Sequence, residues 1–187
     1  VHIHNHSQHS NFDGFSSIED IVKTAKSLGM RAVALTDHGT VSGAIEFLGE
    51  CRKEGIKPIL GCEMYLSRDH TVKDKKGQPD GRKGNRHVNV IAKNYEGFQN
   101  LCALSQISSL EGFYYDPRID FDLLSKHRAG LIITSACLSN IINANLRVGN
   151  YSYAKKAAGM FKEIFADDFY LEMMYHGLSA DAKILGP

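Results

Sequence analysis

Seven side chains that can bind a metal ion stand near the ends of predicted β-strands. They are four histidines, two carboxylates and one cysteine: His4, His6, His38, His87, Asp13, Glu63 and Cys137. When the strands of a barrel each deliver such a side chain to one rim, they can assemble a multinuclear metal centre. A core built for stability alone has little use for several imidazoles at strand ends. The pattern therefore predicts a metal site.

Local spacing supports this interpretation. His4 and His6 are two residues apart in an extended run, so their side chains point to the same face. Glu63 lies in an apolar strand, where a charged carboxylate is costly unless it is paired or bound to a metal. In the LTDHG segment, Asp37 and His38 are adjacent and must point to opposite sides. We assign His38 as a ligand and expect Asp37 to orient it from behind.

Each residue taken alone has a simpler explanation. A single strand histidine is more often a hydrogen-bonded core residue, Asp13 suits a turn, and Cys137 suits a small buried position. Independent residues of these kinds would not all gather at strand ends, so the joint pattern favours a metal. Glu172 and His176 follow another predicted strand and are further candidates for the same rim. Three other histidines lack this placement and are interpreted as surface residues: His9, His70 and His127.

The composition limits the possible functions. The chain has 187 residues, is 43% hydrophobic, and carries 22 basic against 21 acidic side chains. It can bury one core, and no global charge draws it to nucleic acid or membrane. No apolar run approaches the roughly 20 residues that span a bilayer, and the four cysteines form no CxxC pair. We therefore expect a cytoplasmic protein, and its abrupt ends suggest a piece of a longer one.

Short apolar runs alternate with amphipathic stretches, which is typical of an α/β fold built from βα units. Strands are expected at residues 1–6, 31–36, 57–66, 88–92, 130–134 and 169–174. Helices are expected from the capping box at 16–19 to Gly29, from Thr40 or Ser42 to Gly55, and at 95–108, 138–146 and 151–165. The polar, basic stretch 67–86 is expected to be an exposed loop. It is either a flexible insertion or a surface that contacts phosphates.

Several motifs together resemble one known family. HNHS, NFDG, LTDHG, GCEMY, HVNVIAKN, EGFYYDPRID and LIITSACL are similar to the PHP (polymerase and histidinol phosphatase) domain, from Val1 to about Gly177. The last two motifs are typical of the branch found at the N-terminus of bacterial replicative DNA polymerase III alpha subunits. The resemblance implies a single PHP domain over residues 1–187 with a distorted (β/α)7 barrel fold.

The resemblance also implies a centre of up to three divalent transition metals, which are zinc, manganese or iron. It assigns His4 and His6 to the first metal with Glu63 bridging to the second, His87 and Cys137 to the second, and Asp13 with His38 to the third. The family completes this centre with a later Asp-x-His motif, which does not occur in this chain. Because a closed (β/α)8 barrel usually takes roughly 250 residues, we expect an incomplete barrel and centre in this chain.

The implied activity is phosphodiester hydrolysis at the 3′ end of DNA, a 3′→5′ proofreading exonuclease whose nucleophile is a metal-bound water. The expected partners are the DNA 3′ end, the polymerase core of the same chain and other replisome subunits, with no membrane. The parent protein would be a DNA-directed DNA polymerase whose own active site lies downstream. Candidate substrate contacts are Arg86, Tyr115, Arg118 and His176, although Tyr114 and Tyr115 suit buried packing as well as base stacking. Two alternatives stay open: a catalytically silent module that stabilises the polymerase or binds a proofreading subunit, and a histidinol-phosphatase-like phosphoesterase.

Overall fold

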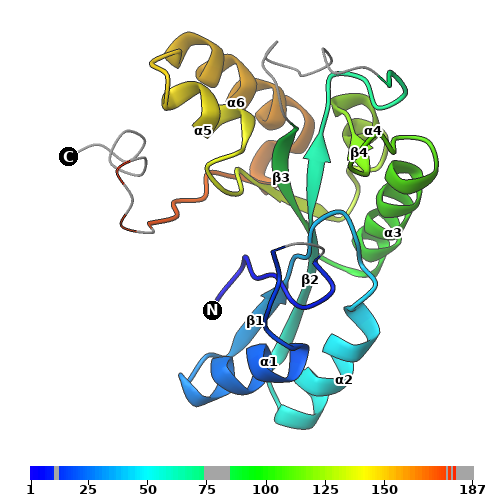
Figure 1. Ribbon diagram of the computed structural model, residues 1–187, viewed down its shortest axis with the longest axis vertical. Coiled ribbons are helices and arrows are strands. Elements are labelled where there is room, and N and C mark those ends of the chain that lie inside the picture. Colours follow the sequence, from blue (N-terminus) through cyan, green and yellow to red (C-terminus); the bar gives the residue numbers. More distant parts are fainter. Residues whose placement is uncertain (11–12, 74–84, 176, 178, 180–187) are drawn as a thin grey trace.

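A computed structural model describes residues 1–10, 13–73, 85–175, 177 and 179 of the chain. Within them, six strands form one mixed sheet in the order β1-β2-β3-β5-β6, with β4 attached to β2. The longest strand, β2 (Lys57–Leu66), runs through much of the length of the molecule (Figure 1). The predicted α/β class is confirmed.

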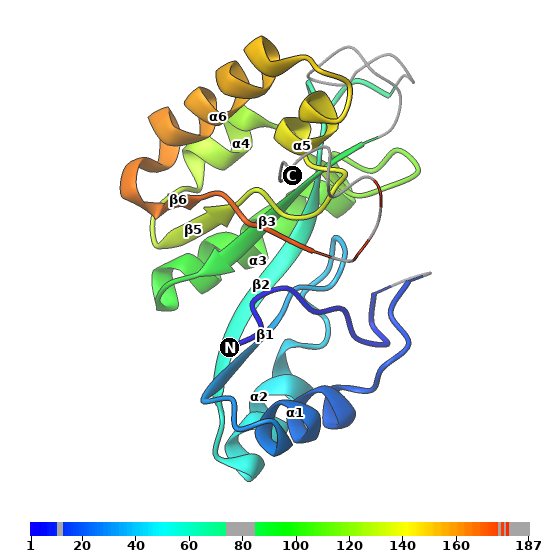
Figure 2. The same ribbon diagram turned by 90° about the vertical axis from the view of Figure 1, so that its left-hand side faces the viewer.

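Strand β2 joins the two halves of the sheet. Its first four residues pair in parallel with β1 (Ala32–Leu35), and its last six pair antiparallel with β3 (Arg86–Ala92). The short strand β4 (Arg118–Ile119) lies parallel to the end of β2. Strand β5 (Leu131–Thr134) pairs antiparallel with β3 and parallel with β6 (Phe169–Tyr170). Figure 2 shows β2 and β3 crossing the middle of the fold.

Two expectations about the strands were wrong in detail. A uniform series of βα units would make neighbouring strands parallel, but β3 runs antiparallel to both β2 and β5. The beginning of β3 therefore lies at the same rim as the ends of β2 and β5. The expected first strand at residues 1–6 contributes one bridge, between His2 and Val33, although the segment lies along β1 through bonds such as that from the Thr36 amide to the Asn5 carbonyl.

Six α-helices and one 3₁₀ turn occur in the described residues. They are α1 (Ile18–Ser27), α2 (Ala44–Glu54), α3 (Tyr95–Leu110), α4 (Phe121–Lys126), α5 (Ile141–Leu146), α6 (Tyr151–Phe165) and η1 (Ala166–Asp168). Gly55 ends α2 in the left-handed conformation, as the sequence predicts. The cap of α1 lies one residue later than the predicted capping box at 16–19 implies, because Ser17, not Ser16, accepts a hydrogen bond from the Asp20 amide. In this part of the chain, no helix has both the length and the apolar character needed to cross a membrane.

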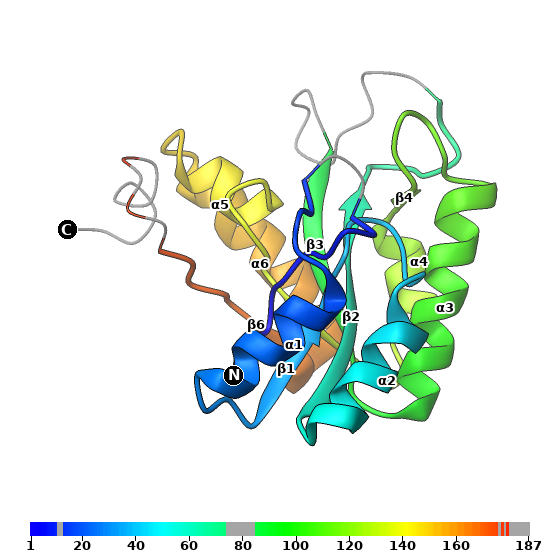
Figure 3. The same ribbon diagram turned by 60° about the horizontal axis from the view of Figure 1, so that its bottom comes forward.

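Alternation along β2 and β3 separates the core from the site. Cys62 and Met64 lie opposite Val90 and Val88, and all four are buried in the main core with α3, α4, α5 and α6. Glu63 and the residues of matching parity therefore face the other side of the sheet. A second core joins α1 and α2 to β1. Figure 3 shows α5 and α6 flanking the strands on one side and α2 and α3 on the other.

Candidate metal centre

The carboxylate of Glu63 is the centre of the candidate site. Glu63 lies in the middle of β2 and is 1% exposed. Its amide donates to the carbonyls of Thr36 and Asp37, and its carbonyl accepts from the Gly39 amide at 3.0 Å. The segment that follows β1 is therefore fixed alongside Glu63, and His38 forms a bridge with it.

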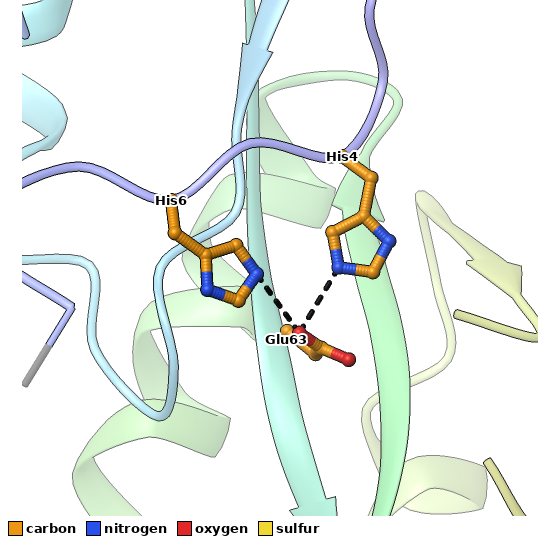
Figure 4. A group of neighbouring side chains, drawn as sticks. All are labelled: His4, His6 and Glu63. Atoms are coloured by element: carbon orange, nitrogen blue, oxygen red, sulfur yellow. Dashed lines mark hydrogen bonds and ion pairs between the residues drawn. The ribbon is translucent and has the colours of Figure 1, made fainter. Parts of the chain in front are cut away.

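Four imidazoles surround this carboxylate. His4 Nε2 and His6 Nε2 lie 3.0 and 2.9 Å from Glu63 Oε2, and His38 Nε2 lies 3.4 Å from the same oxygen. Figure 4 shows the rings of His4 and His6 both directed at the Glu63 carboxylate. His87 Nδ1 lies 3.1 Å from the other oxygen, Oε1. The rings of His4 and His6 therefore lie on the same side of an extended segment, as their spacing in the sequence predicts.

Asp13 extends the cluster on its more exposed side. Its Oδ2 atom lies 3.1 Å from His6 Nδ1 and 2.8 Å from His38 Nε2. Three groups of side chains at this rim could each hold a metal ion: His4, His6 and Glu63; His6, Asp13 and His38; and His38, Glu63 and His87. Compared with the expected sets, His38 belongs to two groups and His6 lies beside Asp13 as well as Glu63.

Ser10 is a positioning residue that sequence reasoning missed. Its hydroxyl donates to Asp13 Oδ1 at 2.7 Å and lies 3.3 Å from His6 Nδ1, and its oxygen accepts from the His38 amide at 3.1 Å. One small side chain therefore connects three of the candidate ligands. A serine in a turn gives no signal that would distinguish this role from ordinary loop chemistry.

Asp37 does not orient His38, contrary to expectation. Its buried carboxylate accepts from the Ser7 amide at 2.6 Å and from the Ser7 hydroxyl at 2.9 Å. The Nδ1 atom of His38 is buried and has no hydrogen-bond partner within the described residues. Because adjacent residues of an extended segment point apart, Asp37 instead fixes the turn that follows His6.

Cys137 lies at the edge of the cluster. Its Sγ atom is 3.5 Å from His87 Nδ1, and it belongs to none of the three groups at the rim. Asn140 donates to the His87 carbonyl at 2.7 Å, and Asn143 donates to the Cys137 carbonyl at 2.9 Å, so the segment after β5 is tied to β3. Burial, together with the nearby Glu63 carboxylate, raises the pKa of the Cys137 thiol to about 12.

Glu172, which the sequence marks as a candidate for this rim, supports His4 from the opposite side. Its Oε1 atom lies 2.9 Å from His4 Nδ1, and its Oε2 atom accepts from the Thr134 hydroxyl at 2.5 Å. The Glu172 amide donates to the Ser135 hydroxyl at 2.8 Å. A proton on His4 Nδ1 is therefore held by Glu172, which directs Nε2 toward Glu63.

The pKa shifts follow from burial and mutual contact. Burial alone would lower the pKa of His4, but the carboxylates of Glu172 and Glu63 outweigh it and raise the pKa to about 9. Burial would raise the pKa of the Glu63 carboxyl, but bonds from His4, His6 and His87 hold it far below its usual range. Burial lowers the pKa of His38. The charges of Glu63 and Asp13 oppose this effect, but the nearby His6 and His87 add to it, and the pKa stays below its usual value.

The donor set fits divalent metals. Imidazole nitrogens and carboxylate oxygens are borderline and hard ligands that zinc, manganese and iron accept. Ligand atoms about 2.1 Å from a shared ion lie roughly 3.4 Å apart, which is close to the 2.8–3.4 Å separations observed at His38 Nε2. Protons alone do not satisfy the cluster well. The pKa of His38 is lowered, and its buried Nδ1 atom has no hydrogen-bond partner in the part of the chain that the structure describes.

The four candidate substrate contacts have different surroundings. Tyr115 is 72% exposed, as a stacking residue would be. Arg118 is 1% exposed, and its guanidinium donates to the backbone carbonyls of Gly112, His70 and Val72. A buried guanidinium held by carbonyls supports its loop and is poorly placed to bind a phosphate, so we assign Arg118 a structural role. Arg86 is also buried, and His176 and most of the basic stretch 67–86 lie outside the described residues.

Together, the mixed α/β sheet and the rim of imidazoles and carboxylates define a candidate metal-binding protein. The PHP domain family profile matches residues 2–176, so the chain belongs to the PHP domain family. DNA polymerase III subunit alpha of Helicobacter pylori is 44% identical over 188 residues, covering 95% of this chain and 15% of that protein. The protein of the same description from Borreliella burgdorferi is 46% identical over 178 residues, with the same coverage of each chain.

The chain thus spans about 15% of the length of these curated relatives. Among solved structures, an amidohydrolase from Chromobacterium violaceum aligns with a TM-score of 0.40 and 21% identity. That alignment covers 57% of this chain and 33% of the other.

Proposed function

We propose that this PHP domain is a metal-dependent phosphodiesterase that removes nucleotides from the 3′ end of DNA. The observation that carries the proposal is the convergence of His4, His6, His38 and His87 on the single carboxylate of Glu63. Burying a carboxylate costs desolvation free energy that several neighbouring groups must offset. A core built only for stability would not need such an arrangement. It is the arrangement expected of side chains that share more than one cation.

The proposed ligands are the seven predicted residues, with Glu63 shared between neighbouring ions. Up to three ions of zinc, manganese or iron would fit, with Cys137 favouring zinc in the site that it shares with His87. When bound, clustered divalent cations lower the pKa of water and stabilise negative charge on phosphate oxygens. The chain's own residues then hold the substrate and the ligand protons in place.

The roles of individual residues follow from their contacts. Glu172 keeps a proton on His4 Nδ1, so that the Nε2 lone pair is available to an ion. Asp37 fixes the N-terminal segment by accepting a hydrogen bond from the Ser7 amide. Ser10 connects Asp13 to the backbone of His38. Asp13 has a side chain that is 45% exposed and lies on the open side of the cluster, where a phosphate would approach.

The wider context is also a proposal. High identity to part of DNA polymerase III alpha subunits favours a place beside a polymerase core, with DNA and other replisome subunits as partners. In that setting, hydrolysis at a 3′ end would be proofreading. We also propose that the mixed sheet is part of a distorted (β/α)7 barrel.

The test is hydrolysis of a 5′-labelled single-stranded oligonucleotide by purified protein with zinc, manganese or iron. We expect shortening from the 3′ end, reduced roughly a hundredfold or more by Glu63→Gln and by His87→Ala. Glu46→Gln, which changes an exposed carboxylate paired with His9, is the matched control and should leave the rate unchanged. Circular dichroism of each variant verifies folding. Metal binding without any cleavage by the parent protein would overturn the catalytic proposal and favour a structural role for the centre.

A further inference from the structure

A cleft of about 360 Å³ opens beside the candidate metal centre. One wall is formed by His38 and Tyr65, whose rings stack with centroids 5.3 Å apart. The other wall is formed by Phe113, Tyr115 and Pro117 from the segment between α3 and β4. Because His38 belongs to two of the three candidate metal groups, this aromatic cleft is continuous with the centre.

The two walls of the aromatic cleft are held in a fixed relation. Gly39, which follows His38, has a φ of +64°, and a Cβ atom built there would lie 2.4 Å from Pro117 Cγ. The end of β2 pairs with β4, so that Tyr65 lies opposite Arg118. The buried Arg118 guanidinium in turn bonds the Gly112 carbonyl. The segment that carries Phe113, Tyr115 and Pro117 is therefore fixed against the rim of metal ligands at two places. One is the close approach of Gly39 to Pro117, and the other is the pairing of β2 with β4.

The exposed rings of this segment need an explanation. Phe113 is 52% exposed and Tyr115 is 72% exposed. Tyr115 also has a φ of 64°, which an aromatic residue rarely adopts. It lies at the tip of a tight turn closed by the bond from the Tyr114 amide to the Asp116 carbonyl. Strained backbone of this kind is often retained where a side chain must be presented to a ligand.

The residues that line the aromatic cleft favour the base of a nucleotide over its phosphate. Among the described residues that line the aromatic cleft, the carboxylate is Asp116 and none is lysine or arginine. A phosphate would be repelled by Asp116, whereas a nucleobase has flat faces for the rings and amino groups for a carboxylate acceptor. The volume lies near the lower end of the roughly 300–1,000 Å³ typical of small-ligand pockets. One nucleoside fits such a space, and a duplex does not.

We propose that the aromatic cleft binds the 3′-terminal nucleoside of a single-stranded DNA end, with its base against Phe113 and Tyr115 and its phosphodiester directed toward His38. This inference rests on the proposed function, since it takes the substrate to be a DNA end. It adds that the site selects an unpaired terminal base by stacking. A paired terminal base would have to leave its partner before entering the cleft.

The test uses an oligonucleotide with 2-aminopurine at its 3′ terminus and an uncleavable phosphorothioate at the last linkage. Stacking quenches 2-aminopurine fluorescence, so the readout is independent of hydrolysis. The variant is Phe113→Ala/Tyr115→Ala, and the control is Tyr95→Ala/Tyr151→Ala, which removes two exposed rings outside the cleft. We expect quenching with the parent and the control, and loss of quenching with roughly tenfold weaker binding for the cleft variant.

Hydrolysis provides the second measurement. For oligonucleotides that end in a normal nucleotide, the cleft variant should raise KM. For those that end in an abasic residue, it should behave like the parent. Quenching without cleavage would support the cleft while rejecting the proposed hydrolysis. Absence of quenching in the parent, or equal quenching in the parent and the cleft variant, would overturn the inference even if the metal centre cleaves DNA.

Discussion

Glu63 and His87 meet diagonally across two antiparallel strands. Glu63 lies opposite Asn89 and His87 lies opposite Tyr65, and the side chains of Glu63 and His87 approach to 3.1 Å between Oε1 and Nδ1. Residues two apart in a strand share a face, so this diagonal contact is possible only on the side of the sheet away from the main core. His87 reaches the rim because β3 begins there.

Metal affinity should rise with pH. The pKa of His4 is raised to about 9 by Glu172 and Glu63, so at neutral pH the metal-free ring carries an extra proton. A metal that binds Nε2 must displace that proton, and each proton released changes the apparent affinity by tenfold per pH unit. Titration calorimetry at pH 7 in two buffers of different ionisation enthalpy should show release of at least one proton. Affinity that is constant from pH 6.5 to pH 8.5 would contradict this account of His4.

Glu172→Gln should weaken metal binding without unfolding the protein. The amide can still contact Thr134, but it no longer holds the His4 Nδ1 proton with a negative charge. Loss of such a support typically lowers metal affinity by about 10–100-fold. Competition with a fluorescent chelator measures the change. Glu163→Gln, an exposed carboxylate on α6, is the matched control. Equal affinities for the two variants would show that Glu172 has no role in binding.

Asp37→Ala should destabilise the fold more than Ser7→Ala. The first change leaves the buried Ser7 amide and hydroxyl without their acceptor. The second removes the hydroxyl bond to Asp37 and the acceptor of the His9 amide, but leaves the Ser7 amide paired with Asp37. We expect losses in the free energy of unfolding of about 2–3 kcal/mol and about 1–2 kcal/mol respectively. Urea denaturation measures both, and Ser42→Ala at an exposed position should change stability by less than about 0.5 kcal/mol. If Asp37→Ala were as stable as the Ser42 control, Asp37 would not anchor the N-terminal segment.

Asp120 should make stability depend on acid pH. It caps α4 through the Leu123 amide and contacts His70, which is thus an anchored residue and not a free surface histidine as expected. Burial would raise the pKa of Asp120, but these bonds outweigh it and hold the pKa below its usual value. A lowered carboxyl pKa stabilises the fold above the unfolded value of about 3.9, and that stabilisation is lost as the pH falls through the folded value.

The advantage of the parent over Asp120→Asn should therefore be about 1–2 kcal/mol near pH 7 and shrink below about pH 4. Denaturant titrations at several pH values measure it. The neighbouring exposed Asp122→Asn provides the control, for which little dependence is expected. A difference that stayed constant down to pH 2 would mean that the Asp120 charge contributes nothing.

The sequence predicts the parts of the site that depend on local patterns. Strand β2 has the expected bounds of residues 57–66, and Glu63 faces away from the apolar core because side chains alternate. Gly55 ends α2 as local chemistry predicts, and the start of α1 lies within one residue of the predicted capping box. The contacts of Asp37 with Ser7 and of Arg118 with three carbonyls were not predictable. They depend on which distant backbone groups the fold brings near. The antiparallel direction of β3 was missed for the same reason, since a strand's pattern does not reveal its direction.

Metal content tests the central claim most directly. Elemental analysis of the purified protein, combined with anomalous scattering from crystals, counts and identifies ions at the rim in one set of samples. We predict more than one transition metal per chain, located within about 2–2.5 Å of Glu63 and its surrounding imidazoles, and a clear fall in content for Glu63→Ala. Less than a tenth of an equivalent in the parent protein, after exposure to zinc, manganese and iron, would contradict a shared metal centre.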